Sequence, residues 1–125
     1  MKHIVTAMLV IVAIIHLLPL PGLLGAHRLE TLYGISITDQ NLAILLRHRA
    51  VLFGLLGSFI LVAAFRPPLQ VIAFSLGFIS VASFLWLAWT VGGYNGQVAR
   101  VLLADLVALG CLAIGVVAYV AQRTA

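Results

Sequence analysis

The sequence predicts an all-α integral membrane protein, a four-helix transmembrane bundle with short connections, on three observations. Hydrophobic residues make up 64% of the chain and charged residues 8%, against about 25% charged in a typical soluble domain. The apolar residues form four runs, each with the ~20 residues that a helix needs to cross a bilayer. These runs are continuous rather than alternating, which argues against a transmembrane β-barrel. The expected helices of this single domain, residues 1–125, are about 4–24, 42–65, 69–91 and 98–121.

The first run follows Met1, Lys2 and His3 in the manner of a signal peptide. It is longer than the usual apolar region of about 7–15 residues and no clean small-residue cleavage site follows, so we expect a retained first helix. Pro19 and Pro21 remove backbone donors, and they predict a kinked or unwound end to this helix.

The first connection, at about residues 26–41, is the one sizeable connection. Residues 27–33 can form a short interfacial helix with its apolar side chains on one side, and Gly34 would end it. Thr38 or Asp39 is expected to cap the second transmembrane helix, because short polar side chains accept hydrogen bonds from free amides.

The other two connections are short. Arg66-Pro67-Pro68 is a sharp stop, which predicts that the second and third helices are antiparallel neighbours. Residues 92–96 are rich in glycine and predict a tight turn. Small residues recur at spacings that allow helices to approach closely in a membrane. They are Gly54, Gly57, Ala73, Gly77, Ala104, Ala108, Cys111 and Gly115.

The net charge of +4 comes from scattered basic residues and forms no stripe for nucleic acid, so attraction to anionic lipid headgroups is the expected consequence. Cys111 is the single cysteine, which excludes an internal disulfide and a cysteine metal cluster. If Arg47 and Arg49 face the bundle, Lys2, Arg66 and Arg123 outnumber the basic residues left on the other side. This distribution predicts cytoplasmic termini.

Ionisable residues inside membrane helices are costly and are therefore candidates for a functional site. His16, His48 and Asp105 are expected roughly 10–12 Å below the same surface, at 1.5 Å rise per residue. The opposite half of the bundle is almost free of ionisable groups, which predicts a one-sided polar vestibule. The candidate ligand-binding residues are Arg47, Arg49, Asp105, His16, His48, Trp86 and Trp89.

Each candidate has a structural and a functional interpretation. Asp105 either forms an ion pair with Arg49, Arg47 or His16, or belongs to a ligand or proton site. Arg100 is a less suitable partner, since five residues place it on another face of the same helix. Arg47 and Arg49 cannot both face inward with His48, so one is expected to snorkel and the other to hold a carboxylate or phosphate.

The aromatic and histidine residues allow further alternatives. Trp86 and Trp89 form either an interfacial aromatic belt or the apolar wall of the vestibule. His16 and His48 at matching depth raise an axial haem site, for which the signal is weak, and zinc would need more ligands. We expect no metal site. The chain has no phosphate-binding glycine loop, H-E-x-x-H or C-x-x-C motif, so no catalytic residues are expected.

Four stretches, at residues 32–35, 45–54, 83–89 and 100–105, resemble a family of small proteobacterial four-helix membrane proteins of unknown function. The resemblance covers nearly the whole chain and implies the fold without an activity. Some members of that family carry the label phosphopantetheine adenylyltransferase. The label does not suit this chain, because that soluble α/β enzyme has an H-x-G-H motif and the present sequence has neither the motif nor an α/β pattern.

From these features we expect a non-enzymatic protein of the bacterial inner membrane that binds a lipid, quinone or other amphipathic or anionic ligand. The alternatives are a small proton-coupled transporter or oligomeric carrier, a haem or redox membrane subunit, and a structural subunit of a larger complex. Membrane lipids are the expected partners, with a homo-oligomer or larger membrane complex compatible with the small-residue faces. No nucleic-acid partner is expected.

Overall fold

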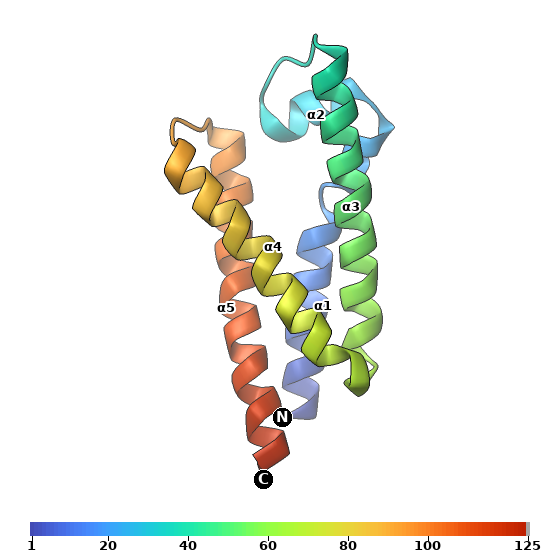
Figure 1. The fold of residues 1–125 in the computed structure, drawn as a ribbon, viewed down its shortest axis with the longest axis vertical. Helices are drawn as coiled ribbons and strands as arrows, with labels where there is room; N and C mark the ends of the chain where they lie inside the picture. Colours follow the sequence, from blue (N-terminus) through green and yellow to red (C-terminus); the bar gives the residue numbers. More distant parts are fainter. Residues whose placement is uncertain (125) are drawn as a thin grey trace.

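The structure is a computed structural model that describes residues 1–124, and in this range it is helical with no strand. Four segments are long and apolar enough to cross a membrane, so the predicted bundle of membrane-capable helices is confirmed (Figure 1). The α-helices are α1 (Lys2–Leu17), α2 (Ala26–Tyr33), α3 (Gln40–Ala64), α4 (Gln70–Val91) and α5 (Gly96–Thr124). Two 3-10 turns, η1 (Leu20–Leu24) and η2 (Pro67–Leu69), complete the elements.

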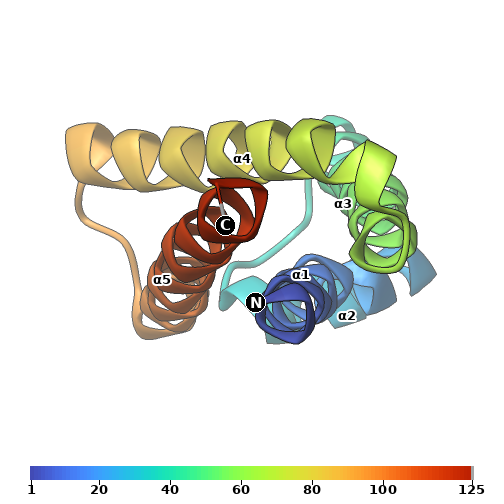
Figure 2. The same cartoon turned by 90° about the horizontal axis from the view of Figure 1, so that it is seen from below.

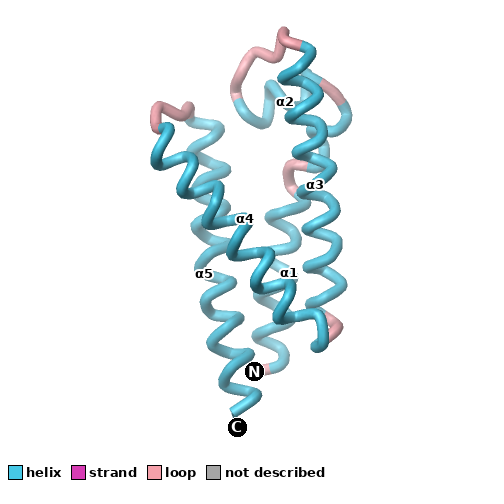
Figure 3. The backbone as a smooth tube through the Cα atoms, in the orientation of Figure 1, coloured by secondary structure: helices cyan, strands magenta, loops and turns pink. Residues whose placement is uncertain are grey.

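Local residue chemistry explains the helix ends. The predicted unwinding near Pro19 is confirmed: α1 ends at Leu17 and the chain continues as η1. The short helix α2 ends at Gly34, whose left-handed φ of 65° favours glycine. Asp39 caps α3, because its Oδ1 accepts a hydrogen bond of 2.8 Å from the amide of Asn41. The loops between helices are short (Figure 3).

Helices α3 and α4 run in opposite directions and contact each other, as predicted, but α4 packs more on α5. The two helices are adjacent at the η2 turn, and α4 then crosses the bundle diagonally (Figure 1). The view from the end that carries both termini shows α4 along one side of the bundle (Figure 2). The buried residues of α4 all lie between Gln70 and Val81, so only its first half is held against the core.

Close helix approaches form the core in the half of the bundle nearest the termini. Helix α1 packs between α3 and α5, and its Leu9 and Val12 are fully buried. A Cβ atom on Gly77 would lie 3.0 Å from Leu112 Cδ2, and one on Gly115 would lie 2.8 Å from the Phe74 ring. These glycines therefore allow the close contact of α4 with α5 that their small size predicts.

A second apolar cluster packs at the opposite end, where α2 covers α3 and α5. Leu29, Tyr33 and Ile37 are buried there, with Leu46 and Val101 packed against them. Asn95 joins this cluster to the start of α5, since its Nδ2 donates to the carbonyl oxygens of Tyr33 (2.8 Å) and Gly34 (3.1 Å). The bundle thus carries a packed core towards the termini and a separate apolar cap at its other end.

Candidate functional site

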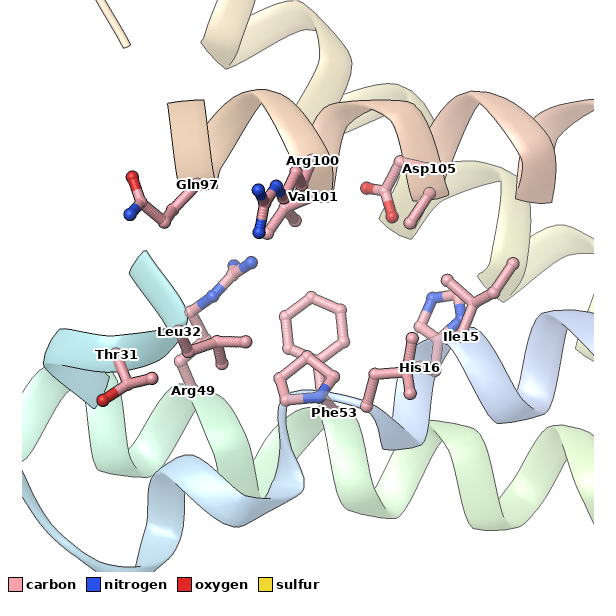
Figure 4. Close-up of a pocket in the computed structure, with 13 residues that line it drawn as sticks. Ile15, His16, Thr31, Leu32, Arg49, Phe53, Gln97, Arg100, Val101 and Asp105 are labelled. Carbon is pink, nitrogen blue, oxygen red and sulfur yellow. The ribbon is translucent and has the colours of Figure 1, made fainter. Parts of the chain in front are cut away.

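A cavity of about 320 Å³ lies between the apolar cap and the core. Its walls come from the end of α1, from α2, from α3 and from the first half of α5 (Figure 4). The lining is largely apolar, with Ile15, Leu32, Phe53 and Val101 among the contributors. A mostly apolar wall with a few polar groups is typical of small-molecule sites, whose volumes run from about 300 to 1,000 Å³.

Arg49 of α3 enters this cavity held by aromatic rings. Its Nε donates a hydrogen bond of 3.2 Å to the Tyr33 hydroxyl. Its guanidinium carbon lies 4.4 Å from the centroid of the Phe53 ring and 5.5 Å from that of Phe84. The ring faces attract the positive charge and fix the plane of the group. Its terminal nitrogens make no hydrogen bond to any of residues 1–124, so they remain available to an acceptor in the cavity.

Asp105 of α5 lines the same cavity and has no hydrogen-bond partner within the described chain, although it is only 8% exposed. No side-chain oxygen of the described residues is both fully inaccessible and unpaired, so the exposed part of the carboxyl group faces the cavity (Figure 4). A carboxylate without a donor is unfavourable in an apolar setting. The predicted ion pairs of Asp105 do not form among residues 1–124, and the group depends on what enters the cavity.

His16 of α1 is 2% exposed and uses both ring nitrogens. Its Nδ1 lies 2.9 Å from the carbonyl oxygen of Val12, and its Nε2 lies 2.9 Å from Oγ of Ser80 on α4. A carbonyl oxygen can only accept, so Nδ1 carries the proton, and in the neutral ring Nε2 accepts from the Ser80 hydroxyl. His16 therefore ties α1 to α4 at the inner end of the cavity.

Arg100 is a cavity residue that the sequence reasoning set aside. It is exposed and lines the cavity together with Asp105, although the two are five residues apart on α5. The cavity is wide enough along the helix for both side chains to reach it, and they make no hydrogen bond to each other. Figure 4 shows Arg49 and Arg100 at one end of the cavity, with Asp105 and His16 at the other.

Four of the seven sequence candidates do not line the cavity. Arg47 is exposed and donates from Nε to the carbonyl oxygen of Leu23 at 3.1 Å, while His48 is exposed beside it. Trp86 and Trp89 are 61% and 76% exposed, with ring centroids 5.8 Å apart. The tryptophans lie on the half of α4 that has left the core, so they do not form the expected wall.

Metal and haem ligands do not gather in the described structure. Residues 1–124 hold no group of three or more histidine, cysteine, aspartate or glutamate side chains that could bind a metal ion. The axial pair of His16 and His48, which the sequence raised only as a weak alternative, does not form across the cavity, because His48 is outside its lining. To act as an axial ligand of haem iron through Nε2, His16 would also have to release its hydrogen bond with Ser80.

The site also contains residues that the sequence reasoning missed. Phe53 follows Arg49 by four residues, the spacing that places two side chains on one helix face, and this signal was present in the sequence. Tyr33 and Phe84 come from other elements, and no local pattern connects them with Arg49.

The fold and the cavity define a class: a helical protein with four segments long and apolar enough to cross a membrane, and with a partly open cavity lined by groups of both charges. Comparison of the chain with protein-family models, curated proteins and solved structures finds no match. The function must therefore be argued from the site.

Proposed function

We propose that this protein binds a small amphipathic or anionic ligand, such as a lipid or quinone, in the cavity between α1, α2, α3 and α5. One observation carries the proposal. Arg49 and Asp105 have opposite charges and face one largely apolar cavity, yet neither is paired with the other. Groups of this kind orient a ligand, because each gains a partner when a complementary molecule enters.

The residue roles follow from this arrangement. Arg49 holds an anionic or carbonyl group, since its terminal nitrogens are free and its plane is fixed by Phe53. Asp105 accepts a hydrogen bond from the ligand, and the apolar residues on the cavity wall contact its carbon skeleton. The proposed role is binding without a chemical step.

Native mass spectrometry of protein extracted from its own membrane tests this proposal. We expect a stoichiometric small molecule in the wild type, with its occupancy reduced at least tenfold in Arg49→Ala. Arg123→Ala is the matched control, because Arg123 is exposed and lies outside the cavity lining. Equal occupancy in Arg49→Ala and wild type would refute the proposal.

Asp105 favours a second candidate, a proton-coupled carrier that works as an oligomer. A buried carboxyl group without a partner is the feature expected of a titrating group inside a membrane protein. In liposomes, a carrier would acidify or alkalinise the interior only when its substrate is present, and Asp105→Asn would abolish this flux. A strictly monomeric protein without flux would leave ligand binding as the function.

We place the protein in the bacterial inner membrane, with membrane lipids as partners and with both termini in the cytoplasm. Lys2 and the chain neighbours of Arg66 and Arg123 line one pocket at the termini-bearing end, and no acidic residue is near any of the three in the sequence, which supports this orientation. Labelling with a membrane-impermeant thiol reagent tests it, in a background with Cys111→Ser. A cysteine at Thr38 should react in intact spheroplasts, and one at Thr124 should react only after lysis. The reverse pattern would overturn the orientation.

A further inference from the structure

The polar groups of the cavity are arranged in a fixed order along its depth. Arg100 lies in the first turns of α5, and Asp105 lies five residues later, about 7.5 Å deeper at about 1.5 Å per residue. In Figure 4, Arg49 and Arg100 lie towards the Gln97 end of the cavity, which we call the outer end because α5 begins there, and Asp105 and His16 lie towards the other, inner end. The ligand must match this order from the surface inwards.

The outer end of the cavity is suited to an anionic group of the ligand. The Arg49 and Arg100 guanidinium groups face the same cavity, and their mutual repulsion is relieved by a negative group between them. With His16 neutral, two arginines against one aspartate leave the cavity with one excess positive charge. A phosphate or carboxylate satisfies both arginines, because each guanidinium offers a planar pair of donors.

The inner end of the cavity is suited to a hydrogen-bond donor of the ligand. Asp105 is more than nine-tenths buried and has no donor among residues 1–124. His16 cannot supply one while its Nδ1 proton is bound to Val12 and its Nε2 accepts from Ser80. A hydroxyl group of the ligand that lies deeper in the cavity than its anionic group would reach the Asp105 carboxyl group.

The remaining wall accepts an apolar chain. Ile15 and the exposed Leu18 line the cavity where α1 ends, at the outer surface of the bundle. A cavity of about 320 Å³ encloses a headgroup and the first carbons of a chain, and the rest of the chain can then leave along this apolar rim.

We propose that the ligand is an anionic single-chain amphiphile of the lysophosphatidate type, with its phosphate on Arg49 and Arg100 and its free hydroxyl on Asp105. This inference rests on the proposed binding function and specifies its ligand class. An aminophospholipid places its ammonium group on the water side of the phosphate, the reverse of the order in the cavity. A diacyl phosphatidate offers the phosphate but lacks the hydroxyl.

Four probes separate these features: 1-oleoyl lysophosphatidate, dioleoyl phosphatidate, 1-oleoylglycerol and glycerol 3-phosphate. Each is titrated into delipidated full-length protein in detergent micelles, and one-to-one complexes are quantified by native mass spectrometry. We expect lysophosphatidate to bind at least tenfold more tightly than each other probe, since loss of a hydrogen bond to a charged group lowers affinity about 10- to 100-fold.

Cavity variants assign the contacts. Arg49→Gln and Arg100→Gln should each weaken lysophosphatidate at least tenfold and leave 1-oleoylglycerol unchanged. Asp105→Leu should weaken lysophosphatidate to the affinity of phosphatidate, and Asp105→Asn, which keeps an acceptor oxygen, should weaken it less. Arg123→Gln, on the same helix as Arg100 but outside the cavity lining, should bind as wild type. Far-ultraviolet circular dichroism checks that every variant is folded.

The outcomes distinguish the inference from the function on which it rests. Equal binding of phosphatidate and lysophosphatidate, with no effect of Asp105→Leu, would overturn the inferred ligand class. If that binding still depended on Arg49, the proposed binding function would stand. Tight binding of glycerol 3-phosphate would overturn the lysophosphatidate inference in favour of a water-soluble phosphate. No Arg49-dependent one-to-one complex with any probe would overturn both proposals.

Discussion

Replacement of Gly57 by alanine tests the close contact between α1 and α3 on which the cavity geometry depends. A Cβ atom at Gly57 would lie 2.8 Å from Leu17 Cγ and 3.1 Å from the carbonyl oxygen of Ala13. Ordinary carbon contacts lie at about 3.5–4.0 Å. The Leu17 side chain can rotate, but the Ala13 carbonyl belongs to the backbone of α1, so the two helices must separate.

The expected change in the free energy of unfolding combines two terms. Overpacking costs about 1–3 kcal/mol, and alanine is more favourable than glycine inside a helix by about 0.5–1 kcal/mol. The difference of these two terms is about 0–2.5 kcal/mol, so Gly57→Ala should be destabilised by about 1 kcal/mol. Gly110→Ala is the matched control, since no atom lies within 4 Å of its added Cβ and only the favourable term remains.

Reversible unfolding in mixed micelles, with increasing mole fraction of sodium dodecyl sulfate and helicity as the signal, measures both variants. The two should differ by about 2 kcal/mol, with Gly57→Ala the less stable, because only Gly57 faces a neighbouring backbone. A Gly57→Ala protein as stable as Gly110→Ala would refute the close approach of α1 and α3.

Three further predictions address contacts around the cavity. Ser80→Ala should lower stability by about 0.6 kcal/mol and at most by about 1.7 kcal/mol, the average and the maximum found for interhelical hydrogen bonds in a membrane protein. A double-mutant cycle with His16→Ala should show coupling. Additive effects would contradict the hydrogen bond of 2.9 Å between His16 and Ser80. Asn95→Ala removes the hydrogen bond that caps α5 at the Val98 amide and the two hydrogen bonds to the carbonyl oxygens of Tyr33 and Gly34 at the end of α2. It should cost about 1–2 kcal/mol and speed amide exchange at residues 34–39, unlike Tyr94→Phe at the exposed neighbouring position. Phe53→Leu should destabilise the protein more than Phe65→Leu does. The Phe53 ring lies 4.4 Å from the Arg49 guanidinium, a contact worth about 0.5–2 kcal/mol. Phe65 is 65% exposed. Equal stability of these two variants would contradict a stabilising contact between the Phe53 ring and Arg49.

Local signals predicted the helices and their ends well. Pro19 and Pro21 indicated where α1 stops, Gly34 indicated the end of α2, and Asp39 was one of two caps expected for α3. Such features depend on neighbouring residues along the chain, so the sequence carries them directly.

The site was predictable only in part. Depth along the helices grouped His16 and Asp105 on one level, and both line the cavity with Arg49. Depth alone carries no information about which way a helix face points, which is why His48 and Arg47 entered the same prediction although they lie outside the lining.

The length and apolar character of four segments, and the prolines and glycines between them, by themselves determined a four-helix membrane-capable chain, because spans and stops are local properties. The tertiary structure decided which polar groups meet. Helix α4 crosses from the η2 turn towards α5, and its burial therefore ends at Val81. That crossing leaves Trp86 and Trp89 exposed, brings Phe84 to Arg49, and sets Ser80 against His16. These contacts join residues from separate helices, and their positions follow from the packing of whole helices rather than from spacing in the sequence.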